Sequence, residues 1–271
     1  MKIFKNKQSL QIQILKDKCI SFVPTMGGLH KGHLSLIQKA KKFKCKILVS
    51  IFVNPKQFNK KDDYQNYPRN IQRDIRELKK LNINYLYLPS SQDVFHFKTK
   101  NKIFLDIFSK KLCGKFRKSH FEGVLDIVNR FLEIIKPKYL FLGFKDFQQL
   151  TLINKHIENK VINTKIIKCK TIREKNGVPC STRNSNLTKN NFKIASNIYY
   201  YLLNLKKKIR KKNRFFKIND IKKDLINLGV DKIDYIENIN ITNLKKTKKT
   251  SDNFKIFIAY YLKKVRLIDN I

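Results

Sequence analysis

The sequence contains no tryptophan, only eight glycines and six prolines, and 20 acidic residues against 60 lysines and arginines. It has no run of about 18 or more apolar residues, which excludes a typical transmembrane helix. Residues 1–17 lack a continuous apolar core followed by a small-residue cleavage site, so we expect no secretory signal peptide and a cytoplasmic location. Neither a GxxxxGK[ST] phosphate loop nor a GxGxxG fingerprint occurs, which argues against common kinases and dinucleotide enzymes.

Cysteine is sparse, and its spacing matches no known disulfide or zinc pattern. The five cysteines are Cys19, Cys45, Cys113, Cys169 and Cys180. Their number is odd and no pair has CxxC spacing, which argues against a disulfide framework and against a structural zinc site. We therefore expect reduced thiols.

The shortage of acidic residues leaves a formal net charge of +40. A charge of this size raises the possibility of a nucleic-acid-binding protein. The cations are mostly lysines spread along the chain, together with many Ile and Asn residues, and these three amino acids share A/T-rich codons. Specific nucleic-acid binding favours clustered arginine and aromatic residues. We interpret the charge as a compositional background and expect no specific nucleic-acid partner and no membrane.

Strand-like and helix-like segments alternate over the first two thirds of the chain. The expected strands are residues 19–23, 46–53, 83–88, 139–142 and 165–169, and the expected helices are 33–43, 69–81, 124–135 and 146–157. This alternation predicts an α/β fold with a Rossmann-like parallel sheet and helices on both faces. Ligands of such sheets lie beyond the carboxyl ends of strands, here after Val23, Val53 and Leu142.

The pattern changes in the last third of the chain. Residues 187–212 and 218–228 are expected helices, and residues 234–241 and 254–261 are expected strands. We therefore predict two domains: residues 1–178 form the Rossmann-like domain, and residues 179–271 form a smaller α+β domain.

The segment Pro24-Thr25-Met26-Gly27-Gly28-Leu29-His30-Lys31-Gly32-His33 follows a predicted strand and opens a predicted helix. His30 and His33 are three residues apart and share one helix face. The start of a helix attracts anions, and the glycines allow close approach of a ligand to the backbone. Taken alone, the motif is equally compatible with two surface histidines in a turn, but its strand–glycine–helix context favours a phosphate site.

Two further motifs lie in the next fifty residues. Asn54-Pro55-Lys56-Gln57 ends a strand and presents Gln57, whose amide can both donate and accept hydrogen bonds, as a hydroxy acid requires. Asp62 and Asp63, followed by Asp74, offer hard oxygen ligands for magnesium. The alternative interpretation for Asp62 and Asp63 is the first turn of a helix, which acidic residues favour.

Three later motifs also combine polar groups with glycine or with the ends of predicted elements. They are Arg117-Lys118-Ser119-His120-Phe121-Glu122-Gly123, Gly143-Phe144-Lys145-Asp146-Phe147-Gln148-Gln149, and Pro179-Cys180-Ser181-Thr182-Arg183-Asn184. Lys145 is suited to meet phosphates, and Gln149 lies one helical turn beyond it. Hydroxyl groups next to Arg183 suit phosphate capture.

In this order and spacing, the six motifs resemble the pantothenate synthetase (pantoate–β-alanine ligase) family of nucleotidylyltransferases with a His-x-Gly-His motif. The resemblance extends from about Phe22 to Asn270. It implies an ATP-dependent ligase of pantothenate biosynthesis that joins pantoate to β-alanine through a pantoyl-adenylate. It also implies a C-terminal domain that acts as a lid, a homodimer, and magnesium as the cofactor of ATP.

The resemblance also assigns roles to individual residues. The catalytic residues would be His33, the expected proton donor, with His30, Lys145 and Arg183. The ATP contacts would be Met26, Gly27, Gly28, Leu29, His30, Lys31, Gly32, His33, Gly143, Phe144, Lys145, Asp146, Ile172, Cys180, Ser181, Thr182 and Arg183. Gln57 and Gln149 would bind pantoate or β-alanine, Asp74 would bind magnesium, and Arg117 would lie nearby. The chain departs from the family pattern at Lys31 and Phe144, where the family usually has acidic residues. The main rival is a nucleotidylyltransferase that stops at adenylyl transfer, which would not need the two glutamines.

Overall fold

A computed structural model describes residues 1–59 and 61–271. These residues form two compact units, Met1–Thr171 and Ile172–Ile271. The division falls ahead of the boundary that we expect at residues 178/179. None of the helices in the described part of the chain combines the length and apolar character needed to cross a membrane.

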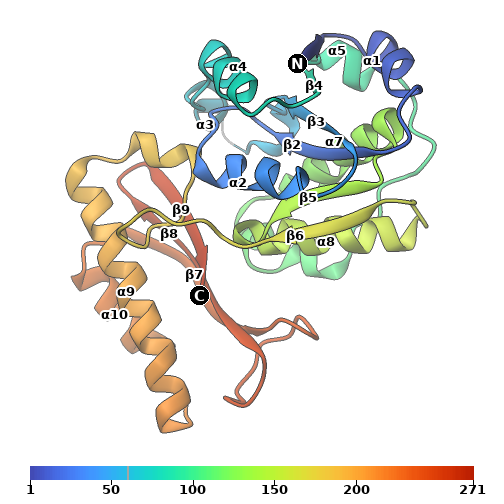
Figure 1. The fold of residues 1–271 in the computed structure, drawn as a ribbon. Helices are drawn as coiled ribbons and strands as arrows, with labels where there is room; N and C mark the ends of the chain where they lie inside the picture. The colour runs from blue at the N-terminus through green and yellow to red at the C-terminus, as the bar shows by residue number, and fades with distance from the viewer. Residues whose placement is uncertain (60) are drawn as a thin grey trace. The chain divides into compact units, whose positions relative to one another are not determined.

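The first unit is built from alternating strands and helices (Figure 1). Its strands are β1 (Lys2–Phe4), β2 (Ile20–Thr25), β3 (Lys46–Ile51), β4 (Tyr85–Tyr87), β5 (Tyr139–Gly143) and β6 (Lys165–Cys169). Its α-helices are α1 (Lys7–Ile14), α2 (Lys31–Ala40), α3 (Lys61–Gln65), α4 (Ile71–Lys80), α5 (Ser91–Phe95), α6 (Cys113–Phe116), α7 (His120–Ile135) and α8 (Phe147–Asn159). The short 3-10 helices are η1 (Pro55–Gln57), η2 (Ile107–Lys110) and η3 (Phe144–Asp146). Asp62 and Asp63 lie in the first turn of α3, as the helix interpretation predicts.

The six strands form one parallel sheet in the order β1-β4-β3-β2-β5-β6. The chain builds outward from β2 in one direction through β3 and β4, and later from β5 to β6 in the other. The strand order therefore reverses between β2 and β5, which are neighbours at the centre. Parallel sheets of this kind open a ligand crevice at such a point, beyond the carboxyl ends of the two strands.

Helices cover both faces of this sheet, as predicted. Alternate side chains of the strands point to opposite faces. Val23 and Val49 pack on one face with Ile37 of α2 and Leu78 of α4. On the other face, the Phe131 ring of α7 packs edge-on against Phe22, Phe52 and Tyr87. A core on both faces explains why the central strands, β2, β3 and β5, are nearly continuous apolar runs.

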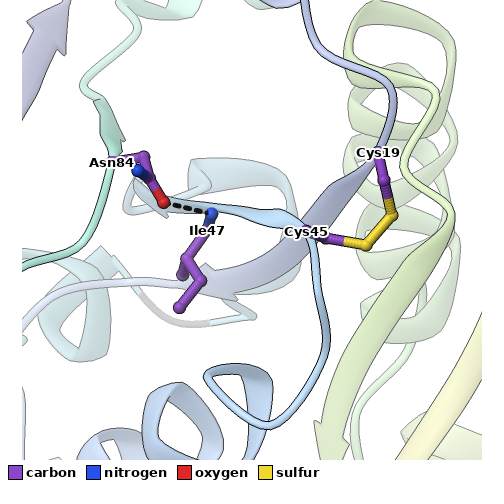
Figure 2. The surroundings of a disulfide bond; sticks show 4 residues. All are labelled: Cys19, Cys45, Ile47 and Asn84. Atoms are coloured by element: carbon purple, nitrogen blue, oxygen red, sulfur yellow. Dashed lines mark hydrogen bonds between the residues drawn. A yellow bond between two sulfur atoms is a disulfide. The ribbon is translucent and has the colours of Figure 1, made fainter.

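The expectation that all five cysteines are reduced is wrong for Cys19 and Cys45, which form a disulfide with a Cα–Cα distance of 4.8 Å (Figure 2). The two residues precede β2 and β3, and the register pairs Ile20 with Lys46. Adjacent in-register strands thus bring together two cysteines that are 26 residues apart. Sequence spacing carried no signal of this pairing. Cys113, Cys169 and Cys180 are buried and take no part in this disulfide.

This disulfide should stabilise the folded chain. Closing a loop of 26 residues destabilises the unfolded chain by about 3.5 kcal/mol in the chain-entropy model. Cys19→Ser and Cys45→Ser should each lower the free energy of unfolding in urea by about this amount, and the double variant should lose no more than either single one. Dithiothreitol should destabilise only the wild type. Five titratable thiols in the unreduced, unfolded protein would contradict the pairing.

A buried histidine makes stability depend on pH. His156 is fully buried, and burial together with Lys160 lowers its pKa to about 4. Its Nδ1 accepts from the Phe104 amide at 3.1 Å, and its Nε2 pairs with the Asn129 Oδ1 at 3.1 Å. The neutral ring therefore ties the segment before η2 to α7 and α8.

Because the unfolded pKa of histidine is about 6.5, the unfolded chain binds more protons than the folded chain between that value and about 4. Stability that is present above pH 6.5 should therefore be lost as the pH falls towards 4. We expect urea unfolding of His156→Gln to show a shallower pH slope in this window. The exposed His96 provides the control, and an equal flattening in His96→Gln would contradict the assignment.

The second unit is a small α+β structure. It contains the 3-10 helix η4 (Thr182–Asn186), α9 (Lys189–Lys212), α10 (Ile218–Asn227) and three strands, β7 (Lys232–Asn240), β8 (Phe254–Leu262) and β9 (Val265–Asn270). The strands form an antiparallel sheet in the order β7-β8-β9. Apolar residues of α9, including Leu202 and Ile209, share a core with Ile256 and Ile258 of β8.

Candidate active site

The polar motifs of the first unit gather where the strand order reverses. The loop from Met26 to His30 follows β2, and the segment Phe144–Asp146 follows β5. The motif with Asn54 and Gln57 follows β3. Since β2 pairs with both β3 and β5, the three loops leave neighbouring strands at the same edge of the sheet.

The glycine loop leads into α2 with two backbone angles that favour glycine. Gly27 has φ +78° and Gly28 has φ +60°. A left-handed conformation at two successive residues is costly for residues with a side chain. The Gly27 amide is also held by the Thr25 hydroxyl at 3.2 Å, and that hydroxyl donates to the Ser50 carbonyl of β3 at 2.8 Å.

His30 and His33 cap the start of α2 through their Nδ1 atoms. His30 Nδ1 accepts from the Gly32 amide at 3.1 Å, and His33 Nδ1 accepts from the His30 amide at 3.4 Å. The ring centroids are 4.0 Å apart. A neutral imidazole that accepts at Nδ1 carries its proton on Nε2. Both rings therefore present an Nε2–H donor at the positive end of a helix.

The surroundings of His33 keep its ring neutral. Burial lowers the pKa of His33 well below its ordinary value, and the electrostatic influence of His30 and of Lys145 acts in the same direction. At neutral pH His33 is therefore a hydrogen-bond donor. The negative charge of a triphosphate close to the ring would favour the protonated form and raise this pKa again.

Lys145 comes from the other side of the reversal point, in η3 directly after β5. Its side chain is 18% exposed, and its Nζ lies 3.3 Å from the Asp146 carboxylate. Gly143, which ends β5, has open space around its Cα, because a Cβ built there would meet nothing within 4 Å. Phe144 and Asp146 are half-buried beside Lys145. The motif thus places a cation next to the two histidines of α2.

Gln57 is held in place from several directions. Its backbone carbonyl accepts from the Arg117 guanidinium at 3.1 Å and pairs with His120 Nδ1 at 2.7 Å. Its side-chain amide contacts the Met26 sulfur and, at 3.5 Å, the Asn54 amide. Arg117 and His120 also contact each other at 2.9 Å. His120 and Asn54 lie within the sequence motifs but have no predicted role, because nothing in the sequence shows that they meet at Gln57.

The neighbouring glutamines of α8 differ in what they contact. Gln148 is buried, accepts from the Cys113 amide at 3.0 Å, and donates to the Phe108 and Lys111 carbonyls at 2.8 and 2.7 Å. Gln149 is half-buried, and its side chain has no hydrogen bond to another residue in the described part of the chain. Of the two, Gln149 keeps its amide available for a ligand.

Asp74 lies in α4 and is 2% exposed. Its two carboxylate oxygens accept from the amides of Gly28 and Leu29, both at 2.8 Å. In the described residues, no group of three or more His, Cys, Asp or Glu side chains is arranged to hold a metal ion. The magnesium site expected at Asp74 therefore stays a prediction. The Asp74 carboxylate, its expected ligand, already accepts hydrogen bonds from two backbone amides.

The remaining candidate residues belong to the second unit. Ser181 caps η4 by accepting from the Arg183 amide at 3.3 Å, and Thr182 begins that helix. Cys180 turns its buried thiol towards the Glu174 carboxylate at 3.2 Å, while its amide donates to the Ile172 carbonyl at 2.9 Å.

The loop before η4 is fixed to β9 of the same unit. Arg173 forms two hydrogen bonds with the Asp269 carboxylate, at 2.7 and 2.9 Å. This bidentate ion pair and the hydrogen bond of the Cys180 amide fix the position of the turn that contains Ser181 and Thr182.

Comparisons with known proteins cover nearly the whole chain. Residues 2–271 match the family model described as Pantoate-beta-alanine ligase. The pantothenate synthetase of Francisella tularensis subsp. novicida (strain U112) is 40% identical over 267 residues, which cover 98% of this chain and 94% of the relative. The pantothenate synthetase of the mediasiatica subspecies (strain FSC147) is 39% identical with the same coverage.

Solved structures agree with the sequence relatives. A crystal structure of pantoate-beta-alanine ligase from Francisella tularensis, complexed with beta-gamma ATP and beta-alanine, has a TM-score of 0.83 at 39% identity and covers 100% of this chain and 97% of its own. The pantothenate synthetase of Thermus thermophilus has a TM-score of 0.90 at 25% identity, with 100% and 99% coverage.

Proposed function

The chain belongs to the pantoate-beta-alanine ligase family, and on this basis we propose that it joins pantoate to β-alanine in an ATP-dependent reaction. The products are pantothenate, AMP and pyrophosphate. The observation that carries the proposal is the whole-chain family match, which includes a relative solved with an ATP compound and beta-alanine. The position of His30, His33 and Lys145 at the reversal point of the sheet supports it.

In the first step, a carboxylate oxygen of pantoate attacks the α-phosphorus of ATP. An O–P bond forms, the bond to the β-phosphate oxygen breaks, and pyrophosphate leaves with the electron pair. Charge develops on the leaving oxygens, and donors already aimed at them lower the barrier. We assign this task to the Nε2–H groups of His30 and His33, to Lys145 and, from the second unit, to Arg183.

In the second step, the β-alanine amine attacks the carbonyl carbon of the pantoyl-adenylate. A C–N bond forms, AMP leaves, and the amine gives up a proton. The mixed anhydride is prone to hydrolysis, so water must be kept away until the amine arrives. We propose that the second unit acts as a lid and that Ser181 and Thr182 meet the β- and γ-phosphates.

The other nucleotide contacts follow the motif match. Met26, Gly27, Gly28, Leu29, Lys31, Gly32, Gly143, Phe144, Asp146, Ile172 and Cys180 are the proposed ATP neighbours. Gln57 and Gln149 are the proposed contacts of the small-molecule substrates, pantoate first. The opposed donor and acceptor atoms of an amide suit the hydroxyl groups of pantoate.

We propose that magnesium arrives with ATP as the MgATP complex, held chiefly by phosphate oxygens and water. This fits a donor set in which the Asp74 oxygens already accept two amides. A homodimer and a cytoplasmic location are further proposals from the family resemblance.

A direct assay tests the proposed function. AMP should accumulate from ATP only when pantoate and β-alanine are both present, in a one-to-one ratio with pantothenate. Stoichiometric AMP formation with a different acid, and none with pantoate, would overturn it. Accumulation of an enzyme-released adenylate without amide formation would instead support a simple nucleotidylyltransferase.

The adjacent glutamines of α8 provide a matched pair of variants. Gln149→Ala should raise the KM for pantoate by roughly tenfold, because a lost substrate hydrogen bond costs about that factor, and should leave stability unchanged. Gln148→Ala should lower the free energy of unfolding by about 2 kcal/mol or more, because it removes three side-chain hydrogen bonds to the main chain at a buried position. Steady-state kinetics and urea unfolding separate the two effects. Equal KM effects on ATP and pantoate in Gln149→Ala would count against its role.

A further inference from the structure

Asp74 holds the glycine loop from a helix that otherwise takes no part in the site. Both its oxygens lie 2.8 Å from backbone amides, one on Gly28 and one on Leu29. These two amides immediately precede His30, the N-cap of α2. The carboxylate is buried, so the bonds form where water does not compete.

The loop conformation is matched to this carboxylate. Because Gly27 and Gly28 both have positive φ, consecutive amides turn towards one side and form an anion-binding concavity. In a phosphate loop such a concavity holds the ligand, but here Asp74 occupies it. The loop is confined further, since a Cβ at Gly27 would lie 3.0 Å from the Asp74 Oδ2 and 3.1 Å from the Ile51 side chain.

Because the Asp74 carboxylate occupies the concavity, the phosphates of a ligand must be bound by other donors. The amides of Gly28 and Leu29 point to Asp74, whereas the Nε2–H groups of His30 and His33 remain directed away from the helix backbone. The orientation of both rings depends on where α2 begins, and the Asp74 bonds fix the two residues before its cap. A displacement of about 1 Å at a reacting group can cost roughly 10²-fold in rate.

We infer that Asp74 is a positioning residue, which sets the glycine loop and the start of α2 so that His30 and His33 face the triphosphate. This role rests on the proposed function for its substrate, ATP. It differs from the magnesium role expected from the sequence, because a carboxylate that accepts two amides acts through the loop and not through the metal.

The test compares Asp74→Asn with a matched control. Asparagine keeps one acceptor but places an NH₂ group against the second amide, so one bond is lost and two donors face each other. Glu133 provides the control, since its carboxylate also accepts from two successive amides, those of Lys100 and Asn101, each at 3.0 Å. Glu133→Gln makes the same acid-to-amide change opposite two successive amides in a loop outside the proposed site.

Three measurements follow, each well below the melting temperatures of both variants. Calorimetric titration with MgATP, without pantoate, should show a dissociation constant raised by roughly tenfold in Asp74→Asn, and kcat should fall by roughly 10–100-fold. The magnesium concentration for half-maximal activity should not change. Glu133→Gln should lose thermal stability but bind ATP as the wild type does.

Each contrary result overturns the inference. Unchanged ATP binding in Asp74→Asn would show that the loop does not need the carboxylate. Equal losses of ATP binding in both variants would reveal a general effect on folding. A large rise in the magnesium requirement of Asp74→Asn alone would make the residue a metal ligand. ATP binding is measured without pantoate, so a wild type that made no pantothenate would refute the proposed function and leave this test intact.

Discussion

His33→Ala should lower kcat by about 10²–10³-fold and leave the fold intact. Loss of one donor aimed at developing charge has an effect of this size in comparable sites. The environment of His33 favours a neutral ring, because burial, His30 and Lys145 all lower its pKa. The ring therefore stays neutral until the phosphates bind. Single-turnover kinetics with saturating ATP, pantoate and β-alanine would measure the effect on chemistry.

His96→Ala is the matched control, since His96 is exposed at the end of α5. It should retain wild-type kcat. A folded His33→Ala variant with near-normal turnover would remove His33 from the mechanism and leave the stabilisation of the leaving group to the other proposed donors.

Gly123→Ala should impair the reaction with pantoate almost as strongly as His33→Ala lowers kcat. A Cβ at Gly123 would lie 2.3 Å from the Lys56 carbonyl oxygen and 2.9 Å from the Gln57 amide nitrogen, so α7 and η1 would have to separate. The Gly123 carbonyl also accepts from Asn54 at 2.9 Å. The shift would move Gln57, and we expect the KM for pantoate to rise or kcat/KM to fall by roughly 10²-fold.

Glu122→Ala tests the same helix without the steric conflict, because Glu122 is exposed. It should bind pantoate as the wild type does. A Gly123→Ala variant with a normal KM for pantoate would show that the position of Gln57 is not critical. A variant that cannot fold would be replaced by Asn54→Ala, which loosens η1 without a clash.

The strands with strong apolar runs could be predicted from the sequence almost to the residue. The expected strand 165–169 coincides with β6, and the runs at 46–53 and 139–142 overlap β3 and β5. β3 and β5 are largely buried on both faces, so their composition alone marks them, whereas most residues of β6 are exposed or half-buried. The α/β fold of the first unit and the smaller α+β second unit are confirmed.

Elements with a weak pattern were missed. Helix α1 (Lys7–Ile14) is largely polar and buries only Leu10 and Ile14, and β1 (Lys2–Phe4) is a three-residue edge strand. Helix α7 begins at His120 and not at the expected Val124. Its first turn contains Gly123, a poor helix former that is required there because η1 approaches so closely.

The candidate site likewise has parts that could be predicted from the sequence and parts that could not. The motifs on the carboxyl ends of β2, β3 and β5 were placed correctly at one edge of the sheet, because parallel topology forces them together. The contacts that hold these motifs in place could not be predicted from the sequence. Asp74 and His120 lie 46 and 63 residues from the backbone groups they contact. The Cys19–Cys45 disulfide could not be predicted for the same reason, because it depends on the register of β2 and β3.

The central claim is a two-step ligase with an acyl-adenylate intermediate. Exchange of labelled pyrophosphate into ATP tests it most directly, because exchange requires a reversible first step that is complete without the amine. We predict rapid exchange with pantoate alone, none without pantoate, and a sharp loss in His33→Ala. Exchange that occurs only when β-alanine is present, or that does not require pantoate, would contradict it.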